Sequence, residues 1–403
     1  MIREYIDNIK AFSPNARLFL IGNFCLSVGI HIFWLLYNLY LKDIGFTESF
    51  IGNVLSIRAI GSVLIALPAA ALINRVHIRY IVIWGAIFSA AGFFLQSVVM
   101  QPIGLMGASC LTGMATTVYM VAAAPFFMRN STPKERVHLF SVNSAINIGA
   151  GFIGSAIGGV LRTTFYQMTS SSVLSYRFAL LSAVVLPLIG IIPYARLQPS
   201  PLIRQPADEK SNFRKHHAEW STIFKLALPS FIVGMGAGLT IPFVNLYFRD
   251  IFQLNTDIIG IIFAFGQIAT FIGMLSSPIL AERIGKLATI LSTQLISIPF
   301  MLIMAFTRSL ALVIPAFLIR GALMNMSTPV SQTFSMEKVP AKDHALTNSI
   351  LNLSWTGSWA VSAFFGGRII EHYGFTLSFC ITSFLYFTST LFYYIFFRRD
   401  LYI

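Results

Sequence analysis

Two arginines stand inside long stretches of apolar residues, where a charged side chain is unexpected. Arg58 lies in the stretch 49–74, and Arg320 lies in the stretch 309–334. A guanidinium group keeps its proton and carries five N–H donors in a rigid fork, which matches the oxygens of a carboxylate or a phosphate. The pair therefore indicates either an anion site or two arginines that are held by backbone carbonyls and polar neighbours such as Asn147.

His31 is the only histidine deep inside an apolar stretch. Imidazole is the side chain that takes up a proton near neutral pH, so His31 is the candidate carrier of a coupled proton. The alternative is a neutral histidine held by hydrogen bonds. All 15 carboxylates fall at the ends of apolar stretches or between them, so a buried acid is not available for the same task.

Further polar side chains in these stretches are candidates to line a solute pathway: Asn23, Asn38, Asn143, Asn147, Asn245, Gln267, Asn325, Asn348 and Asn352. Hydrogen bonds between helices explain most of them equally well, at about 0.6 kcal/mol each. Trp34, Trp355 and Trp359 would either stack on a solute or pack between helices. The candidates for direct substrate contact are Arg58, Arg320, His31, Asn147, Gln267, Asn325 and Trp355.

The stretches that hold these residues are long enough to cross a membrane. The chain is 56% hydrophobic and only 11% charged, against about 25% charged residues in a soluble domain. About 20 apolar residues cross the ~30 Å hydrocarbon core as a helix, and these stretches lack the alternation of strands. Twelve spans are predicted, near 17–41, 49–74, 80–100, 102–128, 138–161, 174–195, 221–248, 257–281, 287–307, 309–334, 345–370 and 375–397.

The positive charge of the chain favours a membrane rather than nucleic acid as its partner. Most of the 28 Lys and Arg residues fall on segments that are cytoplasmic if the N-terminus is inside. This bias predicts that both termini are cytoplasmic and that the protein lies in the cytoplasmic membrane. Arg58 is then nine residues in from Ser49, and Arg320 is eleven residues in from Ser309, so both start about 14–17 Å deep, near the middle of the bilayer.

Several classes of site are not indicated by the sequence. Cys25, Cys110 and Cys380 all fall inside predicted spans, so neither a disulfide framework nor a metal site is expected. The first apolar stretch is full length and lacks a cleavage site, so we expect it to remain as a span. No phosphate-binding Gly-x-x-x-x-Gly-Lys sequence occurs, and no nucleotide or other cofactor is expected. We expect a monomer in the bilayer.

The chain repeats itself at a steady offset. "NLYLKDI" at Asn38–Ile44 returns as "NLYFRDI" at Asn245–Ile251, 207 residues later. At an offset of 208 residues, Gly52 corresponds to Gly260 in the sequence, and Gly158-Gly159 corresponds to Gly366-Gly367. We infer a duplicated six-span unit, whose two copies enter the membrane in the same direction because six is even.

The duplication sets the expected domains: a six-helix bundle over 1–196, a charged cytoplasmic linker rich in proline over 197–219, and a second bundle over 220–403. Asn38 and Asn245 lie near the outer ends of the first and seventh spans. Each is followed by a tyrosine and a charge pair, which is typical of a membrane–water boundary. This repeated segment is predicted to anchor the outer rim, with a role in an external gate.

The two-bundle pattern resembles the major facilitator superfamily over the whole chain. That family carries a Gly-x-x-x-Asp-Arg-x-Gly-Arg/Lys sequence after its second helix, in which the acid and the arginine latch against the opposite half. In the second half this sequence matches Pro278, Glu282, Arg283, Gly285 and Lys286. In the first half the match is degraded to Ala70, Asn74, Arg75, His77 and Arg79, and the acid is replaced by asparagine. The resemblance implies a strong latch only in the second half.

A second family sequence, Gly-x-x-x-Gly-Pro-x-x-Gly-Gly in the fifth helix, occurs in proton-coupled exporters. This chain keeps Gly154, Gly158 and Gly159 but has Ser155 in place of the proline. The glycines indicate close helix packing in any case, because they let two helix backbones approach. With proline absent, the implication of antiport is weaker.

Two classes of function remain. The first is a secondary transporter that moves a small organic solute by alternating access, with a proton or a counter-anion as the candidate coupling partner. The paired arginines favour an anionic or zwitterionic solute, whereas the glycine sequence favours a proton-coupled exporter of drugs or amphiphiles. The second class is a membrane receptor or enzyme. An enzyme would need clustered catalytic groups at one depth, and the seven histidines are scattered.

Overall fold

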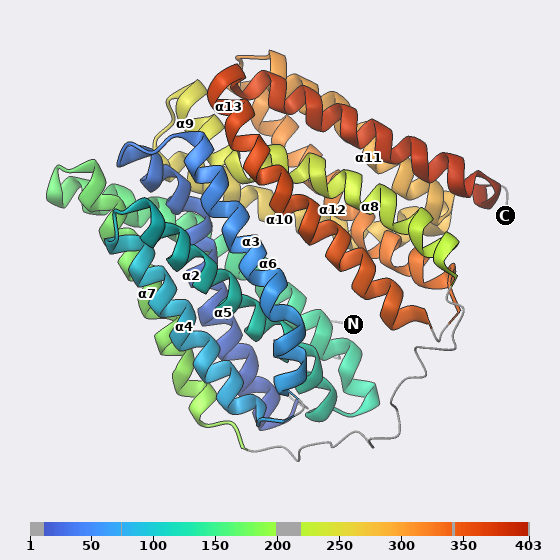
Figure 1. Ribbon diagram of the computed structural model, residues 1–403, viewed down its shortest axis with the longest axis horizontal. Coiled ribbons are helices and arrows are strands. Elements are labelled where there is room, and N and C mark those ends of the chain that lie inside the picture. Colours follow the sequence, from blue (N-terminus) through green and yellow to red (C-terminus); the bar gives the residue numbers. More distant parts are fainter. Residues whose placement is uncertain (1–11, 74, 199–218, 341–342, 402–403) are drawn as a thin grey trace. The chain divides into compact units, whose positions relative to one another are not determined.

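The computed structural model describes residues 12–73, 75–198, 219–340 and 343–401. Every regular element in these ranges is a helix, and no strand occurs among them (Figure 1). Eleven helices of this described part are long and apolar enough to cross a membrane. The predicted all-helical membrane class is therefore confirmed.

The helices group into two compact units. Unit 1 comprises the described residues of 1–44, 57–211 and 256–264, and unit 2 comprises those of 45–56, 212–255 and 265–403. Helices wholly or mainly in unit 1 are α2 (Pro14–Asp43), α3 (Glu48–Ile73), α4 (Ile78–Val98), α5 (Pro102–Arg129), α6 (Pro133–Thr169) and α7 (Ser172–Ala195). Those of unit 2 are α8 (Trp220–Thr240), η1 (Ile241–Phe243), α9 (Val244–Phe252), α10 (Thr256–Ile284), α11 (Lys286–Phe306), α12 (Leu310–Glu337), α13 (His344–Phe397) and η3 (Arg398–Leu401).

The division differs in detail from the predicted bundles. The first turns of α3 group with unit 2, and the first turns of α10 group with unit 1. The predicted linker 197–219 lies largely outside the described residues. The division into 1–196 and 220–403 therefore stays a prediction.

The helix α13 has a break near its middle. It is 54 residues long, and Gly374 in its interior has φ 79° and ψ 176°, which is not helical geometry. Glycine adopts a positive φ without the penalty that a Cβ atom imposes. A continuous helix of this length would measure about 81 Å against a hydrocarbon core of ~30 Å. The break falls between the predicted spans 345–370 and 375–397, while the count of twelve spans stays a prediction.

Local sequence sets where several helices begin and end. Pro14, Pro102 and Pro133 each open a helix, where the missing N–H of proline costs nothing. Ser13 caps α2 by accepting a hydrogen bond from the Ala16 N–H at 3.2 Å. Between the ninth and tenth predicted spans, α11 ends at Phe306 and α12 begins at Leu310. The predicted boundary between the spans 287–307 and 309–334 is therefore confirmed.

Aromatic side chains fill much of the core of unit 1. Phe19 of α2 stacks on Phe126 of α5 with ring centroids 4.3 Å apart and meets Phe127 edge to face. Tyr119 and Tyr194 complete the cluster, and all five side chains are buried. Such pairs add about 0.5–1.5 kcal/mol beyond their buried area. They fix α2 against α5 and α7 in the unit that holds Arg58.

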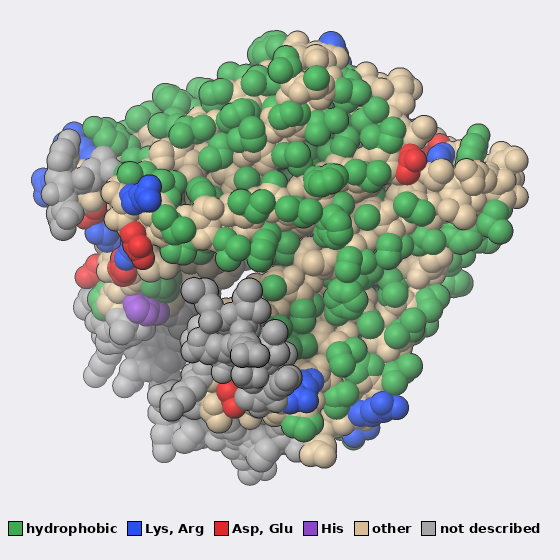
Figure 2. All heavy atoms as spheres, turned by 180° about the vertical axis from the view of Figure 1, so that it is seen from behind, with side chains coloured by type: hydrophobic (Ala, Val, Ile, Leu, Met, Phe, Trp, Pro, Cys, Tyr) green, Lys and Arg blue, Asp and Glu red, His purple; other side chains and the backbone are tan. Residues whose placement is uncertain are grey.

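The surface of the protein carries many apolar side chains. Hydrophobic side chains cover most of the face shown in Figure 2, and the charged groups on it are few. Large exposed apolar side chains occur along nearly every helix, among them Leu64, Ile103 and Phe384. A soluble monomer rarely exposes so much apolar surface. This surface fits a multi-pass protein of the lipid bilayer.

The repeated seven-residue segment makes the same contact twice. The Tyr40 hydroxyl donates to the Ser97 carbonyl at 3.1 Å, and the Tyr247 hydroxyl donates to the Met304 carbonyl at 2.6 Å. Tyr247 follows Tyr40 by 207 residues, and Met304 follows Ser97 by the same number, which is also the offset between the two segments. Both tyrosines are buried, as are Asn38 and Asn245. Each tyrosine therefore ties its helix end to a neighbouring helix, and the role of the repeated segment as an outer-rim anchor stays a prediction.

Candidate functional site

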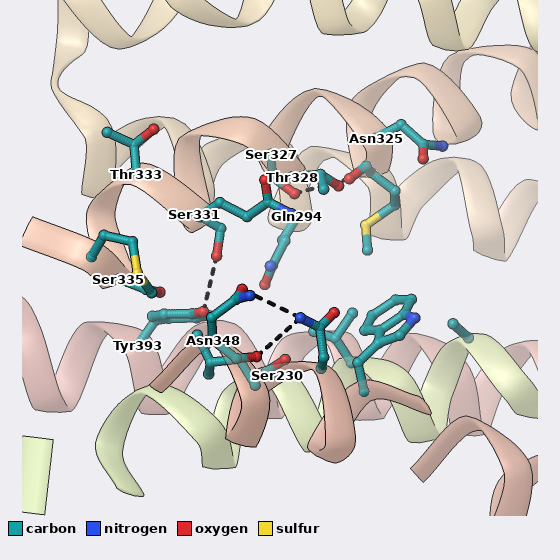
Figure 3. Close-up of a pocket in the computed structure, with 18 of the residues that line it drawn as sticks. Ser230, Gln294, Asn325, Ser327, Thr328, Ser331, Thr333, Ser335, Asn348 and Tyr393 are labelled. Carbon is teal, nitrogen blue, oxygen red and sulfur yellow. Dashed lines mark hydrogen bonds between the residues drawn. The ribbon is translucent and has the colours of Figure 1, made fainter. Parts of the chain in front are cut away.

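A large cavity opens within unit 2. Its volume is about 1480 Å³, and α8, α11, α12 and α13 supply most of its lining (Figure 3). The lining is rich in hydroxyl and amide side chains. Among the lining residues that the structure describes, Glu337 is the only acid. Glu337 forms an ion pair with Lys286, so its charge is already compensated.

Arg320 lies in the wall of this cavity. It is 7% exposed, and its Nη2 donates to the Tyr386 hydroxyl at 2.6 Å. The guanidinium carbon is also 5.7 Å from the centre of the Tyr386 ring, where a cation is attracted to the ring face. Its Nε is buried and has no hydrogen-bond partner in the described part of the chain. Arg320 thus lines the cavity, and its binding of an anion stays a prediction.

Amide and hydroxyl groups continue the cavity wall away from Arg320. Ser331 of α12 and Tyr393 of α13 share a hydrogen bond of 3.2 Å between their hydroxyls. The Gln294 carbonyl oxygen accepts from the Thr390 hydroxyl at 3.1 Å, which leaves its amide nitrogen for the cavity. Figure 3 shows the side chains of Gln294 and Asn348 extending into the same space from different helices. This part of the wall is neutral and polar.

The other predicted arginine has a different environment. Arg58 belongs to unit 1, where its guanidinium carbon lies 4.9 Å from the centre of the Trp34 ring. The carbonyl of Arg58 is also close to Gly113 of α5, where a methyl group would lie 2.0 Å from that oxygen. This environment resembles the packed alternative for Arg58 more than the cavity wall of Arg320. Its proposed contact with substrate stays a prediction.

Unit 1 contains a network of amides between α2 and α6. The Asn23 amide donates to the Asn143 side-chain oxygen at 2.5 Å, and the single O–H of Ser27 is shared between the side-chain oxygens of Asn23 and Asn147, at 3.0 and 2.8 Å. Asn147 in turn donates to the Asn143 carbonyl at 3.0 Å. These bonds occupy the amide of Asn147. They agree with the interhelical alternative that the sequence left open for it.

His31 lies where α2 and α6 approach each other. A methyl group at Gly154 would be 2.8 Å from both the His31 Cβ and the Val28 carbonyl oxygen. No hydrogen bond to the His31 ring is found within the described residues. The role of His31 in proton coupling stays a prediction.

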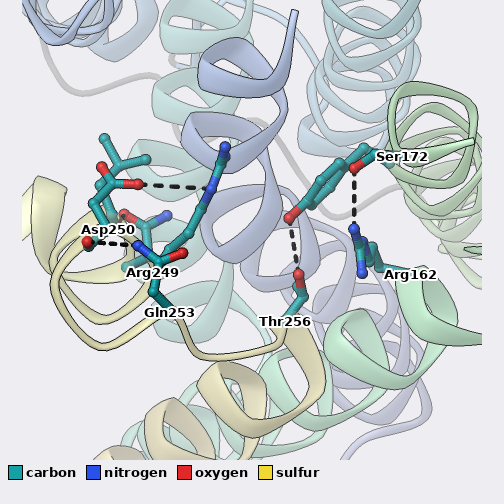
Figure 4. Close-up of polar contacts among 9 residues, drawn as sticks. Arg162, Ser172, Arg249, Asp250, Gln253 and Thr256 are labelled. Atoms are coloured by element: carbon teal, nitrogen blue, oxygen red, sulfur yellow. Dashed lines mark hydrogen bonds and ion pairs between the residues drawn. The ribbon is translucent and has the colours of Figure 1, made fainter.

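Two glycines of the fifth-span sequence differ in how tightly they are packed. A methyl group at Gly159 would lie 2.8 Å from the Thr256 carbonyl, whereas at Gly158 its nearest neighbours would be at an ordinary 3.5 Å. Near the same end of α6, Tyr176 and Thr256 share a hydrogen bond of 2.8 Å, and Arg162 donates to Ser172 at 3.0 Å (Figure 4). Close helix packing therefore accounts for Gly154 and Gly159.

The charge pair that follows the repeated segment is half-buried in unit 2. Arg249 Nε is 3.7 Å from an Asp250 carboxylate oxygen (Figure 4). The Gln253 amide donates to the Asp250 carbonyl at 2.9 Å, and Gln253 has a positive φ of 54°. This turn closes α9. A gating role for the segment of Asn38 and Asn245 stays a prediction.

The family-like sequence between α10 and α11 has one conformational requirement. Gly285 has φ 86°, a value that L-residues rarely adopt, and it separates the two helices. Lys286 pairs with Glu337, and Glu282 and Arg283 are exposed. Arg75 is exposed in the corresponding first-half loop, and Asn74 lies outside the described residues. Their role as latches stays a prediction.

The structure brings only part of the predicted set together. Arg320, Asn325 and Trp355 line the cavity of unit 2, and Gln267 of the same unit does not. Arg58, His31 and Asn147 belong to unit 1. The residues missed as site candidates include Tyr386, Tyr393 and Gln294. Little in the amino-acid sequence marks these residues as site candidates. The spacing of Tyr386 and Tyr393, which are seven residues apart and so share a helix face, is the one indication.

In the described ranges, no group of three or more His, Cys, Asp or Glu side chains is arranged to hold a metal ion. The cavity lining instead offers the guanidinium group of Arg320, the imidazole of His344, the paired carboxylate of Glu337, and amides, hydroxyls and two tryptophans. This set can bind an oxyanion, polar neutral groups and a flat ring.

Comparisons with known proteins agree on one fold. A sequence profile of the Major Facilitator Superfamily matches residues 19–341 and 226–401. The chain is similar to a bacterial homologue of the human lysosomal transporter Spinster in an inward-facing and occupied conformation (15% identity, 96% of this chain and 97% of that chain, TM-score 0.79). It is also similar to the nucleoside transporter NupG (14% identity, 95% and 98% coverage, TM-score 0.73).

A third similar structure is a bacterial homologue of the iron transporter ferroportin in its inward-facing state (14% identity, 94% and 97% coverage, TM-score 0.73). No curated protein sequence matches the chain significantly. At these identities the structural likeness shows the fold and leaves the solute open.

Proposed function

Because this chain belongs to the major facilitator superfamily, we propose that it is a secondary active transporter that moves a small organic solute by alternating access. Its family and its structural neighbours are transporters and not enzymes. The duplication at an offset of 207–208 residues supports the proposal, because many secondary transporters are built from internal repeats. Twelve spans with both termini in the cytoplasm, in the cytoplasmic membrane, complete the proposal.

The proposed solute is an organic anion or a zwitterion. The observation that carries this choice is Arg320 in the wall of a cavity whose only described acid, Glu337, is paired with Lys286. A lone arginine inside a membrane costs at least about 2.5–3.5 kcal/mol, and an oxyanion would offset that cost. Nucleosides and iron are named for two of the similar structures, so the shared fold does not by itself select a solute.

A proton-coupled exporter is the second candidate. It is favoured by His31, which stands at the α2–α6 contact without a hydrogen-bond partner in the described chain. Neutral imidazole can take up a proton there and change the contact. In this version the anion leaves the cell as protons enter.

Transport by reconstituted protein tests the proposal. Vesicles that contain the full chain are exposed to a mixture of metabolites with and without a pH gradient, and their contents are measured by mass spectrometry. The expected result is accumulation of one or a few organic anions beyond the level in empty vesicles. Contents equal to those of empty vesicles would contradict transport, and accumulation of neutral solutes alone would contradict the anion assignment.

A further inference from the structure

Two hydrogen-bonded pairs connect α12 with the part of α13 that follows Gly374. One pair is Arg320 with Tyr386, and the other is Ser331 with Tyr393. All four residues line the same cavity. The two pairs have different chemistry, because the first carries a positive charge and the second is neutral.

The distance between the pairs follows from helix geometry. Tyr386 and Tyr393 are seven residues apart, which corresponds to about 10 Å along α13. Arg320 and Ser331 are eleven residues apart, which corresponds to about 16 Å along α12. The cavity wall therefore has a charged end and a neutral end that are separated by more than the length of a carboxylate or phosphate group alone.

The charged end is open to an oxyanion. A guanidinium group has five N–H donors, and the Arg320 group has one hydrogen bond, to Tyr386, in the described chain. Its Nε is buried without a partner. No carboxylate of the described lining neutralises it, because Glu337 lies beyond Ser331 on α12 and pairs with Lys286. A bound oxyanion would supply both acceptors and charge.

The wall between the two ends presents N–H donors. Thr390 occupies the carbonyl oxygen of Gln294, and Asn352 donates to the side-chain oxygen of Asn348 at 3.3 Å. Each contact leaves an amide nitrogen, and both side chains extend into the same space (Figure 3). Amide nitrogens bind carbonyl or hydroxyl oxygens of a solute. This part of the wall therefore selects a solute with neutral hydrogen-bond acceptors.

An aromatic surface accompanies these donors. Trp355 of α13 is 40% exposed and lines the cavity, as does Trp359 one turn further along the helix. An exposed indole face stacks on a flat ring. Trp355 follows Asn348 by seven residues, so the two side chains share one face of α13. A ring and its polar substituents can thus meet both side chains together.

We propose that the solute of this cavity is an elongated organic anion with two parts. A carboxylate or phosphate binds Arg320, and a flat ring with neutral acceptors binds Gln294 and Asn348 beside Trp355, along the wall that continues toward the Ser331–Tyr393 pair. The inference rests on the proposed transport function and adds to it the length and the second recognition group of the solute. Simple inorganic anions and neutral rings satisfy only one end.

Binding of matched compounds to the purified full chain tests both parts. The phosphate arm compares uridine 5′-monophosphate with uridine, which lacks the oxyanion, and with ribose 5-phosphate, which lacks the ring. The carboxylate arm compares N-benzoylglycine with N-benzoylglycinamide and with N-acetylglycine. In at least one arm we expect the complete compound to bind at least tenfold more tightly than either fragment, as measured by titration calorimetry.

Two variants assign the preference to residues. Arg320→Gln should remove the advantage of the complete compound over its neutral fragment and keep its advantage over the ring-free fragment. Asn348→Ala should do the reverse. The control Ser276→Ala lies in α10, outside the lining, where its hydroxyl bonds only to the Ile272 carbonyl in the described chain, and should keep both preferences.

Several results would overturn the inference. They are equal binding of the neutral fragment and the complete compound, equal binding of the ring-free fragment, binding of neither complete compound, or a preference that survives in Arg320→Gln. The proposed transport function is judged separately by the vesicle experiment. Transport of a neutral solute into vesicles would support the transport function and contradict this inference. An anion that binds but is never transported would contradict the transport function.

Discussion

Gly159 of α6 lies against Gly260 of α10, so closely that a methyl group on Gly260 would be 3.1 Å from the Gly159 Cα. The pair Gly52 and Gly367 repeats this contact in unit 2, where the same distance is 3.3 Å. The offset of 208 residues places Gly52 on Gly260 and Gly159 on Gly367. The duplicated sequence thus preserves a helix crossing that only glycine permits on both sides.

The first prediction concerns that crossing. Gly159→Ala should destabilise the protein by about 1–3 kcal/mol, because the new methyl group meets backbone atoms of Thr256 and Asp257 that cannot move aside easily. Gly149→Ala is the control on the same helix, since a methyl group there has no neighbour within 4 Å. That variant should be neutral or more stable, because alanine favours a helix by about 0.8–1.0 kcal/mol over glycine.

Thermal unfolding of both variants in detergent measures this difference. Equal unfolding midpoints for Gly159→Ala and Gly149→Ala would show that the crossing yields to a methyl group. The explanation that these glycines are repeated because the helices cross too closely for a Cβ atom would then be wrong.

The second prediction concerns Arg320. Arg320→Gln should lower transport at least tenfold while the protein still inserts, because the amide keeps hydrogen-bonding capacity and loses the charge that an oxyanion needs. Arg58→Gln should lower transport less and stability more, because Arg58 stacks on Trp34. Vesicle uptake and thermal unfolding, measured on both variants, separate the two effects. Unchanged uptake by Arg320→Gln would count against the anion site.

The third prediction separates the two tyrosines of the cavity. Tyr386→Phe removes the acceptor of the Arg320 hydrogen bond and should cost about 1.5–3 kcal/mol of stability, the range for bonds to charged groups. Tyr393→Phe removes a bond between two neutral hydroxyls and should cost about 0.5–1.5 kcal/mol. Thermal unfolding gives the order. A larger loss in Tyr393→Phe would mean that Tyr386 does not hold Arg320 in place.

The fourth prediction concerns proton coupling. Between about pH 5 and 8, counterflow by the parent protein should change with pH, and His31→Ala should remove that dependence while solute binding persists. Counterflow in vesicles at a series of external pH values measures it. A variant whose pH profile matches that of the parent would exclude His31 as the proton carrier.

The sequence predicted the membrane class and the repeat well, because both depend on patterns along the chain. Apolar stretches of about 20 residues favour spanning helices, and the predicted boundary between the spans 287–307 and 309–334 was confirmed by the end of α11 at Phe306 and the start of α12 at Leu310. The duplicated tyrosines also made identical contacts. Their burial was not foreseen, because a tyrosine near a span end suits a boundary and a helix contact equally well.

The site was predicted less well, because a helix places side chains around its whole circumference. The sequence alone determined that Arg58 and Arg320 stand in long apolar stretches without a neighbouring acid, and it predicted similar depths for them. Only the tertiary structure decided that Arg320 faces a cavity and bonds to Tyr386, while Arg58 stacks on Trp34. Depth follows from counting residues along one helix, whereas the neighbour that each arginine meets depends on how other helices pack against it.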